Sequence, residues 1–108
     1  MITITLLEDS MGVHKGFLTD GHADYAEHGA DIVCSAVSIL TMNTINAIDV
    51  YTDDEIDVEQ DPKEGFIAMN FRNNPSNEAK LLMDAFVLGL SGLEDQYGKY
   101  LKVLIEEV

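Results

Sequence analysis

The chain has 108 residues, of which 46% are hydrophobic and 24% charged. This composition is typical of one compact globular domain and argues against a disordered or fibrous chain. Twenty acidic side chains stand against six basic ones, which gives a formal net charge of −14. Such a charge argues against direct contact with nucleic acid and favours a basic polypeptide partner, unless it serves only to keep the protein soluble.

The number of cysteines and the N-terminal residues indicate in which cellular compartment the protein works. The one cysteine, Cys34, cannot form an internal disulfide, and residues 1–7 resemble a strand without a basic start or a cleavage site. We therefore expect a cytoplasmic protein. The long uncharged stretch 32–48 carries several serine, threonine and asparagine side chains. It is predicted to be too polar and too short to span a membrane, so a buried helix is expected instead.

The first half of the chain predicts a hairpin, a loop and a helix. Residues 2–7 and 13–19 alternate apolar and polar side chains on either side of a turn, which indicates a β-hairpin. Residues 21–30, with glycines near both ends, indicate a loop. Asp31 is a candidate N-cap for a helix that ends before Thr52. This helix is apolar on more than one side, so we expect contacts on several sides.

The second half predicts two strands, a helix and a last strand. Residues 56–59 indicate a short strand with an acidic outer face, and residues 66–71 a more buried one. A helix is predicted between the Asn-Asn-Pro-Ser of residues 73–76 and Gly98. Its Gly89 and Gly92 each cost roughly 1 kcal/mol relative to alanine, so close packing is expected there. Residues 100–107 indicate the final strand.

The predicted order is thus β-β-α-β-β-α-β over one domain, residues 1–108. We assign the α/β class, of the α+β type, with one mixed sheet and two packed helices.

Cys34 is the first candidate for chemistry. If Asp31 caps the helix, the thiol lies in its first turn, where the macrodipole and unpaired N–H groups favour a thiolate. The N–H of Cys34 could then hold an oxyanion. Asp31 could instead orient a histidine, and the spacing does not decide between these roles. The competing interpretation is that Cys34 is a small buried hydrophobic residue.

Two more residues could assist the thiol. His22 follows Gly21 at the exit of the second predicted strand, where an imidazole could accept the thiol proton and later protonate a departing amine. Ser38 lies one helical turn after Cys34 and should project from the same face. It could bond the sulfur, or it could merely allow close packing. Neither a cofactor motif nor metal-ligand spacing is present in the sequence.

The segment 21–38, which contains Gly-His-Ala and Gly-Ala-Asp-Ile-Val-Cys-Ser-Ala-Val-Ser, resembles the ribosomal-processing cysteine protease family, also called YsxB-like. The resemblance implies that His22 and Cys34 form a catalytic dyad, supported by Gly21, Asp31 and Ser38. It also implies a cofactor-free endopeptidase that acts through a thioester. Its substrate would be the short N-terminal extension of a large-subunit ribosomal protein, and the enzyme would be a homodimer.

Two other functions stay open at this stage. A non-catalytic, ribosome-associated binding or assembly factor would use the acidic surface to hold a basic ribosomal protein, with Cys34 as helix packing. A peroxide-sensing thiol would form a sulfenic acid at Cys34 without any need for His22.

Overall fold

The computed structural model describes residues 1–21 and 28–108; of residues 28–31 it describes only the backbone. The element order is β-β-α-β-β-α-β, which confirms the predicted order. The elements are β1 (Ile2–Glu8), β2 (His14–Asp20), α1 (His28–Tyr51), β3 (Ile56–Asp61), β4 (Phe66–Phe71), α2 (Asn77–Tyr97) and β5 (Leu101–Glu107).

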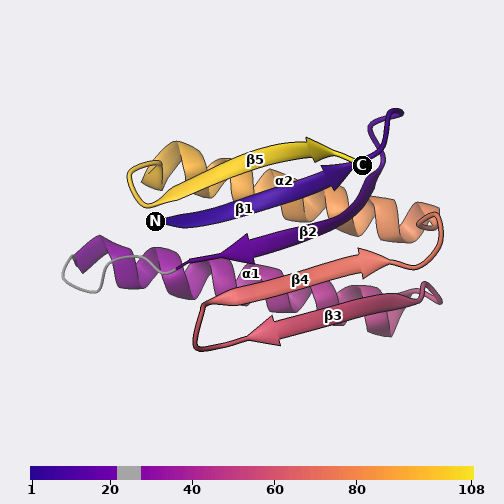
Figure 1. The fold of residues 1–108 in the computed structure, drawn as a ribbon, viewed down its shortest axis with the longest axis horizontal. Coiled ribbons are helices and arrows are strands. Elements are labelled where there is room, and N and C mark those ends of the chain that lie inside the picture. The colour runs from indigo at the N-terminus through magenta and orange to yellow at the C-terminus, as the bar shows by residue number, and fades with distance from the viewer. Residues whose placement is uncertain (22–27) are drawn as a thin grey trace.

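The five strands form one mixed sheet in the order β3-β4-β2-β1-β5. Three of the four pairings are antiparallel, and β1 with β5 is parallel. Both helices lie on the same face of this sheet (Figure 1). The internal strand β4 is mostly buried or half-buried, whereas the edge strand β3 is almost fully exposed, which confirms that β4 is the more buried of the two.

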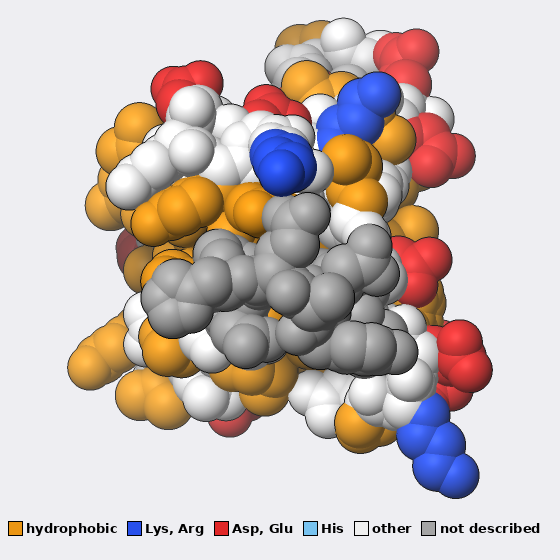
Figure 2. Space-filling model, turned by 90° about the vertical axis from the view of Figure 1, so that its left-hand side faces the viewer, with side chains coloured by type: hydrophobic (Ala, Val, Ile, Leu, Met, Phe, Trp, Pro, Cys, Tyr) orange, Lys and Arg blue, Asp and Glu red, His pale blue; other side chains and the backbone are white. Residues whose placement is uncertain are grey.

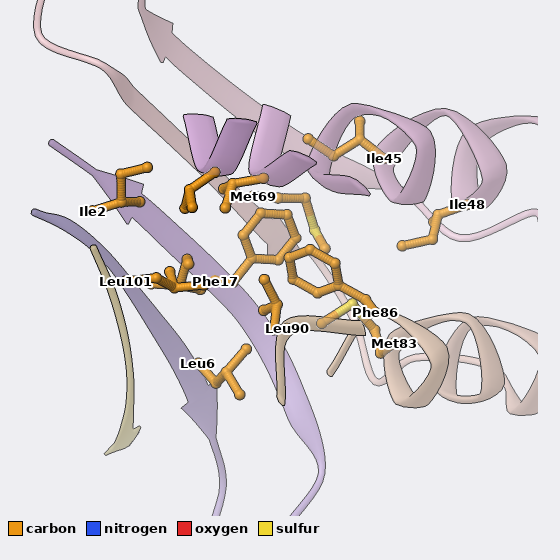
Figure 3. Packing of buried hydrophobic residues seen from close by; sticks show 13 residues of the cluster. Ile2, Leu6, Phe17, Ile45, Ile48, Met69, Met83, Phe86, Leu90 and Leu101 are labelled. Atoms are coloured by element: carbon orange, nitrogen blue, oxygen red, sulfur yellow. The ribbon is translucent and has the colours of Figure 1, made fainter. Parts of the chain in front are cut away.

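The core lies between the helices and the sheet (Figure 3). Alternate residues of β1 point to this layer because side chains of a strand alternate between its two faces. At its centre the rings of Phe17 and Phe86 are 4.6 Å apart and tilted by 42°. The buried cluster comprises Ile2, Ile4, Leu6, Phe17, Val33, Val37, Ile45, Ile48, Met69, Met83, Phe86, Leu90 and Leu101.

The two glycines of α2 behave differently. A Cβ on Gly89 would lie 2.9 Å from Cδ2 of Leu40, so α1 packs closely against α2 there, as predicted. No atom of the described residues lies within 4 Å of a Cβ on Gly92, so the expectation of close packing at that position was wrong. The start of α2 is fixed by Ser76, whose side chain accepts a hydrogen bond of 3.1 Å from the N–H of Ala79.

Helix α1 begins earlier than predicted. It starts at His28, so Asp31 is its fourth residue and not its N-cap. Acidic residues are favoured both at the N-cap and within the first turn, and the preceding Ala30 is a strong helix former. The Asp31 signal therefore marked the beginning of the helix without fixing its first residue.

The length of α1 also changes the argument about membranes. Residues 32–51 form a 20-residue stretch that is long and apolar enough, by length and composition alone, to cross a membrane. The prediction that the stretch is too polar and too short to span a membrane was therefore wrong on both counts. The core helix of a globular domain meets the same criteria, and in the structure Val33 and Ile48 of α1 are fully buried against the sheet and α2.

Candidate active site

A cleft of about 460 Å³ opens between α1 and the end of the sheet where β2 stops. Helix α1 contributes one wall, the β3–β4 hairpin the opposite wall, and Ile2 and Thr19 the floor between them. This end of the molecule lies at the left of Figure 1 and faces the viewer in Figure 2. Hydrophobic side chains occupy much of it, and acidic side chains gather along one margin (Figure 2).

The α1 wall contains the predicted thiol. Cys34 is half-buried and lines the cleft together with Ser38, as the spacing of one helical turn predicts. Thr41 continues the same line a further turn along the helix. Three polar or polarisable side chains therefore follow one another along an otherwise apolar wall. Since Cys34 reaches the cleft, it is not sealed within the hydrophobic core.

The opposite wall is mostly apolar and comes from the β3–β4 hairpin. Phe66 and Ile67 supply its hydrophobic surface. Gln60 reaches across to the helix, and its Nε2 donates a hydrogen bond of 3.4 Å to Sδ of Met42. Bonds to thioether sulfur are weak, so this contact links the two walls of the cleft only loosely.

Gly21 lies at the rim of the cleft, where steric constraints require a glycine. Its φ is +99°, a conformation that residues with a Cβ rarely adopt, and a Cβ there would lie 2.5 Å from the carbonyl oxygen of Met1. Glycine thus allows the chain to leave β2 while β1 begins beside it. The structure brings Gly21 and Cys34 to one cleft. His22, the next residue along the chain, lies outside the described residues.

The position of Cys34 within α1 corrects the predicted route to a thiolate. Cys34 is the seventh residue of the helix, whereas unpaired N–H groups and the macrodipole effect are confined to the first turn. The N–H of Cys34 belongs to the helix ladder, so the prediction that it could hold an oxyanion was wrong. The side chain of Asp31 lies outside the described part, so its role in orienting a histidine stays a prediction.

Of the remaining histidines, His14 does not line the described cleft. His14 lies near the β1–β2 turn, at the opposite end of β2 from Gly21, and its Nδ1 is 3.3 Å from Oε1 of Glu8. The side chain of His28 is outside the described residues. Among the side chains that the structure describes, no group of three or more histidine, cysteine, aspartate or glutamate residues could hold a metal ion.

Sequence reasoning missed several residues of the cleft, among them Gln60, Phe66 and Thr41. Gln60 and Phe66 come from a hairpin that is distant along the chain, and nothing in their local pattern indicates a site. Thr41 could have been found, because it continues the helical spacing of Cys34 and Ser38. Met42 lines the cleft and also packs against the hydrophobic core.

Comparisons with known proteins define first the class of protein and then the family. The family model described as "Cysteine protease Prp" matches residues 1–102. The chain is 32% identical over 98 residues to the ribosomal processing cysteine protease Prp of Bacillus subtilis (strain 168), covering 82% of this chain and 86% of that protein. A thiol that faces an open cleft and this match together define the class: the protein is a cysteine protease.

Solved structures agree over nearly the whole chain. The Prp protease of S. aureus in complex with a substrate peptide superposes with a TM-score of 0.91 at 26% identity, covering 98% of this chain and all of that one. The same protease with a covalently linked product peptide gives a TM-score of 0.89 at 27% identity, with the same coverage. The chain belongs to the Prp family of ribosomal processing cysteine proteases.

Proposed function

We propose that the protein is a cysteine endopeptidase that removes a short N-terminal extension from a basic large-subunit ribosomal protein. The observation that carries this proposal is the joint position of Cys34, Ser38 and Gly21 on one predominantly apolar cleft. Peptide complexes of the S. aureus relative, one of them covalent, support a peptide as the occupant. No cofactor is needed for the reaction.

The chemistry follows from a thiol and an imidazole. His22 accepts the proton of Cys34, and the sulfur attacks the carbonyl carbon of the scissile peptide. The C–N bond breaks as His22 returns the proton to the departing amine, which leaves a thioester on Cys34. Water then attacks the thioester while His22 takes its proton. The C–S bond breaks, the acid leaves, and the proton returns to the thiolate to restore the thiol.

The supporting residues have more limited roles in this scheme. Gly21 fixes the backbone from which the chain proceeds to His22, and Ser38 offers a hydroxyl on the same helical face as the sulfur. We assign to Asp31 the role of orienting the imidazole, since its fourth position in α1 argues against the alternative role as N-cap.

Charge supports a basic substrate. The net charge is −14, and the open face of β3 carries the exposed carboxylates of Asp57, Glu59 and Asp61. Such a surface attracts a basic polypeptide from a distance and repels a phosphate backbone. We further propose that the enzyme works in the cytoplasm as a homodimer, without direct contact with nucleic acid or membrane. Light scattering on the purified chain tests its oligomeric state.

Peptide cleavage tests the proposed reaction. The purified chain is mixed with a synthetic peptide that spans the extension junction, and the products are identified by mass. Cys34→Ala and His22→Ala should yield no products. Ser35→Ala is the matched control, because Ser35 is the exposed neighbour of Cys34 and does not line the cleft; it should cleave like the parent chain. Equal cleavage by Cys34→Ala and the parent chain would show that Cys34 is not the nucleophile. Tight binding of the peptide without any cleavage would favour the non-catalytic binding factor.

A further inference from the structure

Thr41 carries a hydroxyl group that the fold leaves without a partner. The side chain is 0% exposed, and its Oγ1 has no hydrogen-bond partner among the described residues. A buried hydroxyl without a hydrogen bond is unfavourable, and in most proteins such a group is satisfied. The position therefore needs an explanation beyond packing.

Thr44 of α1 and Thr52, the residue that follows the end of this helix, show what the hydroxyl would ordinarily do. Thr44 Oγ1 donates to the carbonyl oxygen of Leu40 at 2.8 Å, and Thr52 Oγ1 donates to that of Ile48 at 2.7 Å. Both use the carbonyl four residues earlier, which is the usual partner of a threonine within a helix. Thr41 makes no such bond, although Val37 occupies the equivalent position. Its hydroxyl is thus left available for another group.

The hydroxyl lies beside the cleft that holds Cys34. Thr41 lines that cleft seven residues after Cys34, on the same helical face as Ser38. The adjoining wall consists of Met42 and Gln60, two flexible side chains that are joined only by the weak N–H···S bond. A ligand that displaces this pair gains access to the hydroxyl.

We propose that Thr41 is a specificity-determining residue, whose hydroxyl hydrogen-bonds a neutral polar side chain of the substrate. This inference rests on the proposed peptidase function, because it assumes a peptide in the cleft. The described lining of the cleft, which includes Val37 and Ile67, carries no charged side chain, so an ionised side chain is disfavoured. A hydroxyl or amide group on an apolar stem satisfies both the surroundings and Thr41.

Helix geometry gives the approximate position of that side chain. Seven residues along α1 correspond to about 10 Å at a rise of 1.5 Å per residue. An extended peptide advances about 3.3 Å per residue, so the partner of Thr41 lies about three residues from the scissile bond. A peptide that follows α1 therefore places its reacting carbonyl at Cys34 and its recognised polar side chain at Thr41.

The test asks whether the effect of replacing one residue of the peptide depends on the side chain at position 41 of the protein. In the junction peptide, each neutral polar residue is replaced in turn by an apolar residue of similar size, such as Gln→Met or Thr→Val. For the parent protein, one such replacement should lower kcat/KM on the order of tenfold. For Thr41→Val the same replacement should have no effect, whereas Thr41→Ser should retain the preference. Loss of the preference in Thr41→Ser, or an equal response of Thr41→Val and the parent protein at every position, overturns the inference.

A matched control separates recognition from folding. Thr44→Val makes the same chemical change one turn away, at a buried hydroxyl that is bonded within the helix. It should lower the Tm and leave the peptide preference unchanged. Thr41→Val removes an unpaired hydroxyl, so its Tm should equal or exceed that of the parent protein. A lower Tm for Thr41→Val than for Thr44→Val would show that the Thr41 hydroxyl is satisfied within the fold, which overturns the inference.

Binding distinguishes a failure of this inference from a failure of the proposed function. The labelled peptides are titrated by fluorescence anisotropy into Cys34→Ala and into the double variant Cys34→Ala/Thr41→Val. If the parent protein cleaves the peptide but its peptide preference does not depend on Thr41, the peptidase proposal stands and the subsite proposal fails. If the parent protein does not cleave the peptide but peptide binding still depends on Thr41, the subsite proposal stands and the peptidase proposal fails. A peptide that is neither bound nor cleaved overturns both.

Discussion

Replacing Gly21 by alanine perturbs the backbone at the rim of the cleft. The new Cβ would lie 2.5 Å from the carbonyl oxygen of Met1 at a φ of +99°. A left-handed conformation costs alanine about 1–2 kcal/mol. Movement of the Met1 carbonyl disturbs the adjacent bond from the N–H of Ile2 to the carbonyl of Tyr100, now 2.9 Å, which is worth roughly 1 kcal/mol. We expect Gly21→Ala to lower the free energy of unfolding by about 2–3 kcal/mol.

The same change should impair turnover, because Gly21 precedes the proposed base His22. A displacement of about 1 Å at a catalytic group can cost on the order of 100-fold in rate. Urea unfolding and kcat/KM are measured together, with Gly12→Ala as control. Gly12 also has a positive φ, +79°, but nothing lies within 4 Å of its Cβ position, and it lies at the other end of the hairpin. Equal loss of stability in both variants, with activity unchanged, would refute the proposed clash.

Three further predictions follow from the packing and the charges. Gly92→Ala should raise the free energy of unfolding by about 1 kcal/mol, whereas Gly89→Ala should lower it by about 1 kcal/mol because its Cβ meets Leu40; urea titration measures both. Burial raises the pKa of Asp54, but hydrogen bonds from Ser76 outweigh burial and hold that pKa below its ordinary value. The stability from this carboxylate is present above about pH 4 and lost as pH falls through the lower folded pKa. The difference in urea midpoint between the parent protein and Asp54→Asn should therefore shrink from pH 7 to pH 3. Added salt should lower kcat/KM for a basic peptide more than for a neutral one of the same length, and an equal response would contradict electrostatic attraction.

The alternation of apolar and polar residues and their helical spacing predicted most elements of the fold. The spans of β1, β2 and α2 follow the predicted patterns to within a residue or two at their ends. The strand order was not predictable, because the parallel pairing of β1 with β5 joins opposite ends of the chain. The apolar breadth of α1 corresponds only in part to contacts within the described chain: Val33 and Ile48 are buried, whereas Ile32 is 50% and Ile39 70% exposed.

The candidate site was only partly encoded in local pattern. Cys34 and Ser38 are related by helical spacing, so their shared face could be read from the chain. The opposite wall depends on which hairpin lies beside α1, and this is decided by the pairing of β2 with β4. Thr41 shows a further limit, since a hydroxyl without a partner becomes visible only when the positions of its neighbours are known.

The corrected start of α1 changes what must activate the thiol. With Cys34 at the seventh helical position, the positive end of the macrodipole is nearly two turns away, and its influence falls off within the first turn. Ser38 can donate a hydrogen bond to a sulfur but is a poor acceptor of its proton at neutral pH. Proton removal from Cys34 therefore depends on an imidazole, and the proposed reaction needs His22 more strongly than a thiol at a helix N-terminus would.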